Sequence, residues 1–259
     1  MLEARDIIYR VGSVEILHGV SAQFQAGKLS VIVGPNGSGK STLLRVMSGE
    51  YRPSQGEVWY GDRPLNSIAH RDRAKVRAVL AQRTELSFPL TVTEIVLMGR
   101  YPHFLVKPSE EDYAICEAAL ERIGAMEFST RNYLTLSGGE QQIVQFARIL
   151  AQIWNAPEGS TKYLLLDEPT TFLDLKHQHQ FLRLARELAL EGAVVVAVIH
   201  DINLAAQYAD FILAIESGRV LTSGTSREVI QPDIIRSLYH TQTTVLHPEG
   251  LEFPIVVAS

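Results

Sequence analysis

The chain has 259 residues, of which 46% are hydrophobic, and it carries a net charge of −5 and a single cysteine. The hydrophobic fraction is enough for a substantial core, and the negative charge argues against a nucleic-acid binder held by bulk electrostatics. One cysteine excludes an internal disulfide framework, and the lack of a long apolar run or a signal-peptide pattern predicts a soluble or peripheral protein of a reducing compartment.

Strands come first in the predicted order of elements. Residues 1–33 alternate apolar and polar side chains, which predicts strands joined by turns, the last of which runs into a glycine-rich loop. The spacing over 41–47 predicts a helix that ends near Gly49. Further strands are predicted at 57–60 and 76–81.

The pattern becomes helical from residue 83 to residue 152. Thr91 and Glu94 have the spacing of a capping box, which predicts one helix start. Ser109 precedes three acidic residues, a pattern that predicts a second helix start. The apolar face of this second helix is expected to hold Tyr113, Cys116, Leu120 and Ile123. A third helix is predicted after Gly139.

Strands and helices alternate again after residue 152. The near-continuous apolar runs 163–166 and 193–199 predict parallel strands buried on both faces, with a helix over 174–190 between them. A hairpin is predicted over 211–221, because a Ser-Gly turn separates two apolar runs. Short helices and a tail with strand-like stretches from residue 243 complete the chain.

The glycine-rich loop has the sequence Gly34-Pro35-Asn36-Gly37-Ser38-Gly39-Lys40-Ser41-Thr42. Gly34-x-x-x-x-Gly39-Lys40-Ser41 between a strand and a helix is the P-loop pattern. Its backbone N–H groups and the helix N-terminus are expected to hold phosphates. Lys40 is expected to reach the β- and γ-phosphates, and Ser41 to bind Mg²⁺. An ordinary glycine turn is the alternative, and a full match in this context argues against it.

Two carboxylates follow the apolar run 163–166. Ligands of open α/β sheets bind at the carboxyl ends of strands, so Asp167 and Glu168 are expected beside the P-loop. Asp167 is predicted to hold Mg²⁺ through water, and Glu168 to polarise the attacking water. The alternative is a solvated acidic turn ahead of Pro169, which the presence of a P-loop disfavours.

The third motif is Leu136-Ser137-Gly138-Gly139-Glu140. Alone it would be a helix N-cap with flexible glycines. Together with the P-loop and the acidic pair it resembles the nucleotide-binding subunits of ABC transporters, over essentially the whole chain. The resemblance implies an α/β fold, with a P-loop NTPase core, an antiparallel β subdomain and an inserted α-helical subdomain (the ABC ATPase fold). In this single domain 1–259, the core and β subdomain would take 1–82 and 153–259, and the helical subdomain 83–152.

The resemblance also implies a composite ATP site. Ser137, Gly138 and Gly139 would cover the γ-phosphate held by the opposite subunit of a head-to-tail homodimer, so that two ATP molecules are sandwiched. They would form a second anion site at a helix start.

Three single residues gain roles from the same resemblance. Gln82 resembles the Q-loop glutamine that senses Mg²⁺ and the γ-phosphate, and His200 resembles the switch histidine that contacts the γ-phosphate. Asp174 lies in a segment similar to the D-loop, which crosses the dimer interface. Without the three motifs, Gln82 and His200 would be ordinary strand-end or capping residues.

The chain departs from the family pattern at three places. Ile143 stands where arginine is frequent, and Phe172 where a small residue is usual. The family often stacks adenine on an aromatic residue before an early glycine, and Val11 occupies that place. Val11 and Ile16 would then give the base only apolar contact, with Tyr9 as the alternative if the register differs.

Residues 88–103 resemble the ATPases of bacterial importers for iron-siderophores, haem and vitamin B12. Within that group, the stretch 154–162 and the tail 245–250 are similar to haem importer ATPases. The resemblance implies two copies of a membrane permease, whose coupling helices would contact the region of Gln82 and residues 83 to about 104. It also implies a periplasmic substrate-binding protein as an indirect partner, and a peripheral location on the cytoplasmic face of the bacterial inner membrane.

Direct contact with haem or nucleic acid is not expected. Four histidines are candidates for haem ligands, but surface positions are the simpler interpretation; they are His177, His179, His240 and His247. Two alternatives stay open for the function: an importer ATPase for siderophores or cobalamin, and a soluble ABC ATPase that acts as a mechanical or regulatory switch.

Overall fold

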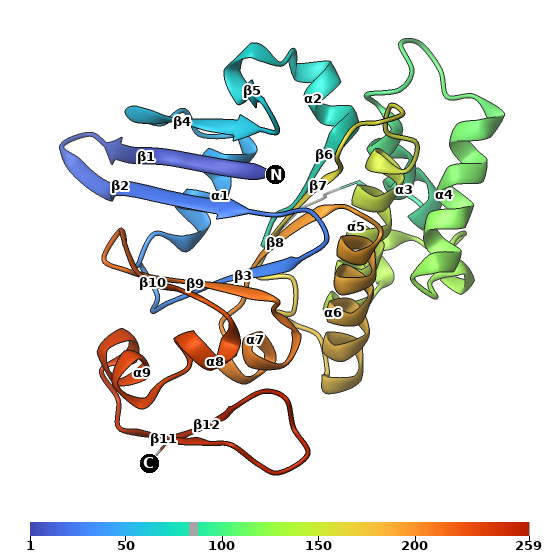
Figure 1. Ribbon diagram of the computed structural model, residues 1–259. Helices are drawn as coiled ribbons and strands as arrows, with labels where there is room; N and C mark the ends of the chain where they lie inside the picture. The colour runs from blue at the N-terminus through green and yellow to red at the C-terminus, as the bar shows by residue number, and fades with distance from the viewer. Residues whose placement is uncertain (83–87, 259) are drawn as a thin grey trace.

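The computed structural model describes residues 1–82 and 88–258, and a six-stranded sheet runs through its centre (Figure 1). Its strand order is β10-β9-β3-β8-β7-β6, and every neighbouring pair is parallel except β10 with β9. The strands are β3 (Leu29–Val33), β6 (Arg77–Leu80), β7 (Tyr163–Asp167), β8 (Val194–Val198), β9 (Phe211–Glu216) and β10 (Arg219–Gly224). The predicted parallel strands and the hairpin are therefore confirmed.

The middle strands are apolar on both faces because both faces are covered. All residues of β3, β7 and β8 are buried. Leu164, Leu166 and Val195 pack into one core cluster with α5 and α6, while Leu165 and Val196 pack into the other, with α1 and the antiparallel sheet. This alternation follows from the period of two along a strand.

An antiparallel sheet with strand order β2-β1-β4-β5 lies over the face that α1 covers (Figure 1). Its strands are β1 (Leu2–Val11), β2 (Val14–Phe24), β4 (Gln55–Tyr60) and β5 (Arg63–Pro64), and α1 spans Lys40–Ser48. The helix ends as predicted at Gly49, whose φ of 75° is the left-handed conformation that glycine adopts readily.

Helices dominate the described part of the segment after β6. They are α3 (Val92–Leu97), the 3₁₀ turn η2 (Met98–Arg100), α4 (Glu110–Arg122), the 3₁₀ turns η3 (Met126–Phe128) and η4 (Tyr133–Thr135), and α5 (Gly138–Ile153). Thr91 forms the predicted capping box with Glu94, and the predicted helix start at Ser109 also proves to be a capping box, with Asp112. The predicted apolar face of α4 is wrong at Tyr113, which is 45% exposed, because the buried stripe runs through Ile115 and Ala119. Residues 83–87, where this segment was expected to begin, lie outside the described residues.

The C-terminal third adds helices and a small hairpin. They are α6 (Leu175–Leu190), α7 (Ile202–Tyr208), α8 (Ser226–Val229), α9 (Pro232–Tyr239), β11 (Thr243–Leu246) and β12 (Ile255–Ala258). Two further short elements precede β6, namely η1 (Leu65–Ser67) and α2 (His70–Val76). The sequence analysis missed α2 and α7. In the described residues, no helix is both long and apolar enough to cross a membrane.

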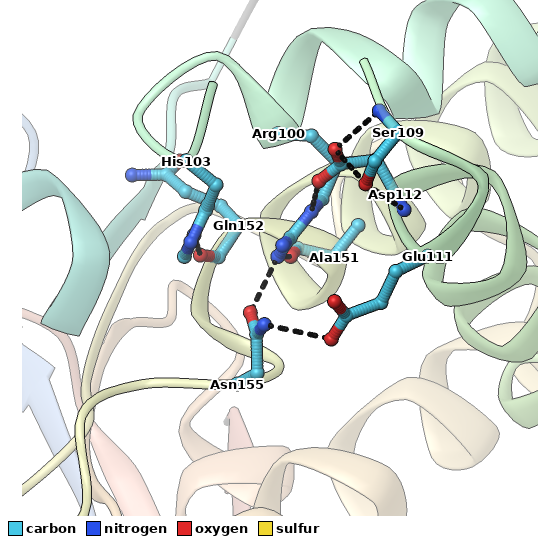
Figure 2. A network of polar contacts seen from close by, with 8 residues as sticks. All are labelled: Arg100, His103, Ser109, Glu111, Asp112, Ala151, Gln152 and Asn155. Atoms are coloured by element: carbon cyan, nitrogen blue, oxygen red, sulfur yellow. Dashed lines mark hydrogen bonds and ion pairs between the residues drawn. The ribbon is translucent and has the colours of Figure 1, made fainter. Parts of the chain in front are cut away.

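A buried ion pair joins η2, α4 and the end of α5 (Figure 2). Arg100 is 1% exposed, and its Nε donates to Asp112 Oδ1 at 2.9 Å. Its Nη1 donates to the Ala151 carbonyl at 2.7 Å and to Asn155 Oδ1 at 2.9 Å. Burial alone would raise the pKa of Asp112, but hydrogen bonds from Ser109 and Arg100 outweigh it and hold that pKa below its usual value.

Arg100→Ala should therefore destabilise the protein by about 3–5 kcal/mol, because the Asp112 carboxylate would stay buried without its partner. The loss, measured by urea unfolding, should shrink as the pH falls through the lowered pKa of Asp112, where that carboxyl is protonated. Arg10→Ala, which breaks an exposed pair with Glu15, is the control and should change stability little. A similar small loss for both variants would contradict this interpretation.

Candidate functional site

Four chain segments with polar side chains leave the central sheet at the same edge. Parallel pairing aligns Leu80 with Leu166 and Leu166 with Ala197, and Ile32 pairs with Val198. The carboxyl ends of β3, β6, β7 and β8 consequently lead into the glycine-rich loop, Gln82, Glu168 and His200 respectively. This edge is where ligands of open α/β sheets bind.

The glycine-rich loop takes a path that side chains would block. Gly34 has a φ of 150°, and a Cβ there would lie 2.1 Å from the Ile215 carbonyl oxygen. The loop is supported from the β9–β10 turn, where the Gly218 N–H donates to the Ser38 carbonyl at 2.9 Å. Gly39 then leads into α1 with a φ of 99°. Of the predicted loop residues, Pro35, Asn36, Gly37 and Thr42 lie in the same continuous strand–loop–helix segment.

Lys40 is held inside this loop. Its Nζ donates to the carbonyls of Gly34 at 2.9 Å and Pro35 at 2.8 Å, and the residue is 5% exposed. Burial lowers the pKa of Lys40, and the charges of Glu168 and Asp167 oppose that shift. The ammonium group therefore sits at the centre of the loop, opposite two carboxylates, where it can compensate phosphate charge.

Ser41 and Asp167 join the start of α1 to the end of β7. Ser41 Oγ donates to Asp167 Oδ1 at 2.7 Å, and Asp167 is 2% exposed. Burial raises the pKa of Asp167, and the Ser41 hydrogen bond opposes the rise. A hydroxyl and a carboxylate side by side next to a phosphate loop fit Mg²⁺, a hard cation that takes oxygen ligands and usually completes its shell with water and phosphate oxygens.

Glu168 is bound from both neighbouring strand ends. Gln82 Nε2 donates to Glu168 Oε2 at 2.5 Å, and His200 Nε2 lies 2.6 Å from Glu168 Oε1. A carboxylate only accepts hydrogen bonds, so His200 carries its proton on Nε2 in this contact. The backbone of Glu168 has a φ of 52°, a conformation that costs a non-glycine residue about 1–3 kcal/mol and is found at functional sites. The structure thus brings three of the predicted catalytic residues together.

Ser137, Gly138 and Gly139 of the third motif, called the signature residues below, line a cavity of about 690 Å³. Ser137 caps α5 through a capping box with Glu140, and Asp174 caps α6 by accepting from the His177 N–H at 2.9 Å. Ser137, Gly138, Gly139 and Asp174 all line this cavity, whereas no residue of the 34–42 loop is among its described lining. Within one chain, the P-loop therefore does not contribute to the cavity that the signature residues line.

Phe172 lies beside the signature glycines. A Cβ at Gly139 would come within 3.3 Å of the Phe172 carbonyl oxygen, and one at Gly138 within 3.7 Å of Phe172 Cβ. Phe172 has a φ of 68° and is 61% exposed. Its large side chain thus borders the cavity that Ser137 lines. Ile143, the other departure in this region, lines the same cavity and packs against the core.

The predicted base-contacting residues differ in exposure. Val11 is 59% exposed at the β1–β2 turn, where it pairs with Val14. Ile16 lies close to the P-loop, since a Cβ at Gly39 would be 3.4 Å from its carbonyl oxygen. The ring of Tyr9 stacks on that of Tyr51, with centroids 5.2 Å apart. The assignment of the adenine to Val11 stays a prediction, and Tyr9 already has a ring partner.

Two contributors to the site were missed by the sequence analysis. Thr171 Oγ1 lies 3.5 Å from Glu168 Oε2, and the turn glycine Gly218 supports the P-loop. Gly218 could be recognised as a hairpin residue from its sequence, but its contact with a loop 180 positions earlier carries no local signal.

The four histidines considered as haem ligands do not form a cluster. His179 Nδ1 lies 2.7 Å from the Tyr208 hydroxyl, and His177 Nδ1 lies 2.7 Å from Asp174 Oδ1. His240 and His247 are exposed. Across the described residues, no group of three or more His, Cys, Asp or Glu side chains is placed to hold a metal ion.

Comparison with known proteins identifies the family. The family model described as ABC transporter matches residues 17–171. The chain belongs to the ABC transporter family. The hemin import ATP-binding protein HmuV of Gloeobacter violaceus is 46% identical over 99% of this chain and 94% of its own length. HmuV of Deinococcus radiodurans is 44% identical over 100% of this chain and 97% of its own length.

Solved structures of other ABC proteins have the same fold as this chain. A protein assigned as a metal-chelate type ABC transporter, in an inward-facing conformation, is 26% identical, with a TM-score of 0.84 over 100% of this chain and 96% of that chain. A dimeric bacterial ABC transporter cassette is 28% identical, with a TM-score of 0.74 over 87% of this chain and 98% of that chain. The ABC ATPase fold expected from the sequence is confirmed.

Glu168→Gln should retain ATP binding and lower turnover about 10²–10⁴-fold, because only the carboxylate that would orient and polarise water changes, while Lys40 and Asp167 remain. Steady-state ATPase assays and nucleotide-binding titrations measure the two effects separately. Glu249→Gln in the exposed tail is the control and should behave as the parent protein. Near-normal turnover in Glu168→Gln would refute the role given to this carboxylate.

GTP should support hydrolysis within about tenfold of ATP, a gap of roughly 1.4 kcal/mol, because Val11 gives the base no aromatic platform. An aromatic ring typically adds about 1–3 kcal/mol of stacking per base, so Val11→Tyr should tighten ATP binding. Affinities of ATP and GTP for the parent protein, Val11→Tyr and Tyr9→Ala test this. A strong ATP preference that disappears in Tyr9→Ala would assign the base to Tyr9 instead.

Proposed function

We propose that this protein is the ATP-hydrolysing subunit of a haem importer and powers a partner membrane permease. The ATPase part of this proposal rests on one observation. Gln82 and His200 both contact the Glu168 carboxylate, next to the Ser41–Asp167 hydrogen bond. The transport part is supported by relatives of 41–46% identity that are named hemin import ATP-binding proteins.

Each residue of the site has a proposed task in hydrolysis. The P-loop amides and Lys40 bind the β- and γ-phosphates, and Ser41, Asp167 and Gln82 hold Mg²⁺. The metal, when bound, neutralises phosphate charge that develops during the reaction. Glu168 accepts a hydrogen bond from the attacking water and so orients it toward the γ-phosphate.

His200 and Gln82 position that carboxylate. Each donates to a different oxygen of Glu168, so the carboxylate plane is fixed from two sides. A carboxylate that is already held in place needs no rearrangement at the moment of reaction, which lowers the barrier. The predicted contact of His200 with the γ-phosphate would require its Nε2–H to leave Glu168.

The active unit in this proposal is a head-to-tail homodimer. Ser137 and the amides of Gly138 and Gly139 present an anion site at the N-terminus of α5. These residues line a cavity to which the P-loop of their own chain does not contribute, so in this proposal a second subunit brings the two segments together. Asp174 lines the same cavity and would lie at the dimer interface.

The permease is proposed to contact the helical subdomain, residues 83–152, beside the core formed by 1–82 and 153–259. Phe88 and Tyr101 are 71% and 60% exposed in the described part of the region where coupling helices are expected. Two permease copies would hold the protein peripherally on the cytoplasmic face of the bacterial inner membrane. A periplasmic substrate-binding protein would deliver the substrate, which never touches this chain.

A siderophore or cobalamin importer is the second candidate. The structural neighbour assigned as a metal-chelate type transporter favours it over a soluble ABC switch, but the relatives named for hemin import cover nearly the whole chain at higher identity. The haem importer and the siderophore or cobalamin importer both take up a chelated metal, and they differ only in which compound is transported.

Ser137→Arg should fold normally yet block the ATP-bound dimer, because a bulky cation would fill the γ-phosphate site of the other subunit. Mixed with Lys40→Ala, it should give heterodimers with at most one competent site. Size-exclusion chromatography with ATP and ATPase assays of the mixture measure both effects. Ser223→Arg on the edge strand β10 is the control. Recovery of full two-site activity in the mixture would contradict the head-to-tail arrangement.

Transport assays decide the substrate. The protein is co-expressed and purified with its permease, reconstituted in vesicles, and supplied with haem, a ferric siderophore or cobalamin. Haem should be transported in an ATP-dependent manner that Glu168→Gln abolishes. ATP-dependent transport of a siderophore or of cobalamin, without haem transport, would replace the substrate and keep the ATPase. Failure to purify with any polytopic membrane protein would favour the soluble switch.

A further inference from the structure

A second cavity lies at the end of α1 that faces away from the P-loop. It encloses about 600 Å³ and is lined by the end of α1, β4, η1, α2 and the connections between them. Helix α1 has nine residues, so ~13 Å of helix separates this cavity from the phosphate loop. In Figure 1, β4, β5 and α2 lie above α1 on this side of the molecule.

The lining of this cavity is positively charged. Arg52, Arg73 and His70 contribute basic side chains, and Asn66 and Ser67 add neutral polar groups. No aspartate or glutamate belongs to its described lining. A concave surface with one sign of charge concentrates ions of the opposite sign.

Arg73 is a buried cation without a counter-charge in the described part of the fold. It is 6% exposed, and its Nε is buried without a hydrogen-bond partner. Its Nη2 lies 2.7 Å from His70 Nδ1, and within the described chain it forms no ion pair with a carboxylate. Arginine stays charged at any accessible pH, and a buried charge without a counter-charge is costly.

The neighbouring Arg77 shows the contrast. Its guanidinium donates to the Ser48 carbonyl at the end of α1, where the negative end of the helix dipole favours a cation. Burial lowers the pKa of Arg77, and the charge of Arg73 lowers it further, although Tyr60 and Glu50 act in the opposite direction. The Nε of Arg77 also lacks a hydrogen-bond partner among the described residues, but its charge lies at the negative end of a helix. The charge of Arg73 adds repulsion there that a bound anion would relieve.

His70 supplies a second directed donor. Because Arg73 can only donate, His70 must accept at Nδ1, which leaves its proton on Nε2. His70 is exposed and lines the cavity, so Nε2–H is available to a ligand. The guanidinium of Arg73 also lies against Gly49, where a Cβ would be 2.6 Å from Nη1. Glycine at the helix end therefore makes room for this arginine.

We propose that this cavity is a binding site for a phosphate-bearing anion, held by Arg73 and His70 and drawn in by the exposed Arg52. Guanidinium groups form charge-assisted hydrogen bonds to phosphate oxygens, and a phosphate would also neutralise the buried charge. The phosphate can belong to a free metabolite or to a lipid headgroup, which share this chemistry. The site shares no residue with the P-loop and does not rest on the proposed transport function.

Inorganic pyrophosphate is the first probe, and isothermal titration calorimetry measures its binding to full-length Lys40→Ala protein, in which the P-loop is weakened. Binding should persist there, and Arg73→Gln in the same background should weaken it at least tenfold. Arg63→Gln, an exposed arginine of β5 outside the cavity lining, is the matched control and should leave binding unchanged. If Arg73→Gln does not fold, Arg52→Glu at the exposed rim gives the same test.

Vesicles of phosphatidylglycerol, compared with phosphatidylcholine, are the second probe in a co-sedimentation assay. Pyrophosphate binding that depends on Arg73 or Arg52 assigns the site to a free phosphate compound. Binding to anionic vesicles with the same dependence, and none to pyrophosphate, assigns it to a lipid headgroup. The proposal is overturned if both probes bind the Arg73 and Arg52 variants as tightly as the parent, or if neither binds the Lys40→Ala protein.

Discussion

The site depends on one carboxylate that is held by side chains from two other strand ends. Gln82 follows β6, His200 follows β8, and Glu168 follows β7 between them in the sheet order. The contact of Gln82 with Glu168 spans 86 positions of sequence and exists only because β6 and β7 pair in parallel, in register. The sheet thus fixes the position of Glu168, whose backbone is left-handed.

The same segment connects hydrolysis to the proposed dimer interface. Gln142 of α5 donates to the Pro169 carbonyl at 3.3 Å, and Gln178 of α6 donates to the Thr170 carbonyl at 3.3 Å. The helix that Ser137 starts is therefore bonded to the residue after Glu168. Phe172, with a second left-handed backbone, lies against the signature glycines. The segment between the two places is a short turn with its own backbone hydrogen bonds, so Glu168 and the proposed dimer interface are joined by a continuous structured segment.

Sequence patterns predicted the elements whose signals are local. The P-loop, the capping box of Thr91 and the apolar strands were all predicted, because each is defined by residues within a few positions of one another. Helix α2, with the sequence HRDRAKV, was missed because it has no apolar period, and α7 was missed because it is a single short helix after Asp201. The face of α4 was misjudged at Tyr113 because tertiary packing, and not spacing, decides which stripe is buried. Contacts such as Gly218 with Ser38, or Gln82 with Glu168, depend on distant chain segments meeting in space.

A double-mutant cycle on turnover tests the central claim most directly. Steady-state ATPase rates are compared for the parent protein, Gln82→Ala, His200→Ala and the double variant, with nucleotide binding measured alongside. If both side chains act by holding the Glu168 carboxylate, their effects are coupled, and the double variant loses clearly less activity than the product of the two single losses. Losses that multiply without coupling would show that Gln82 and His200 act independently, and would contradict a site built on one shared carboxylate.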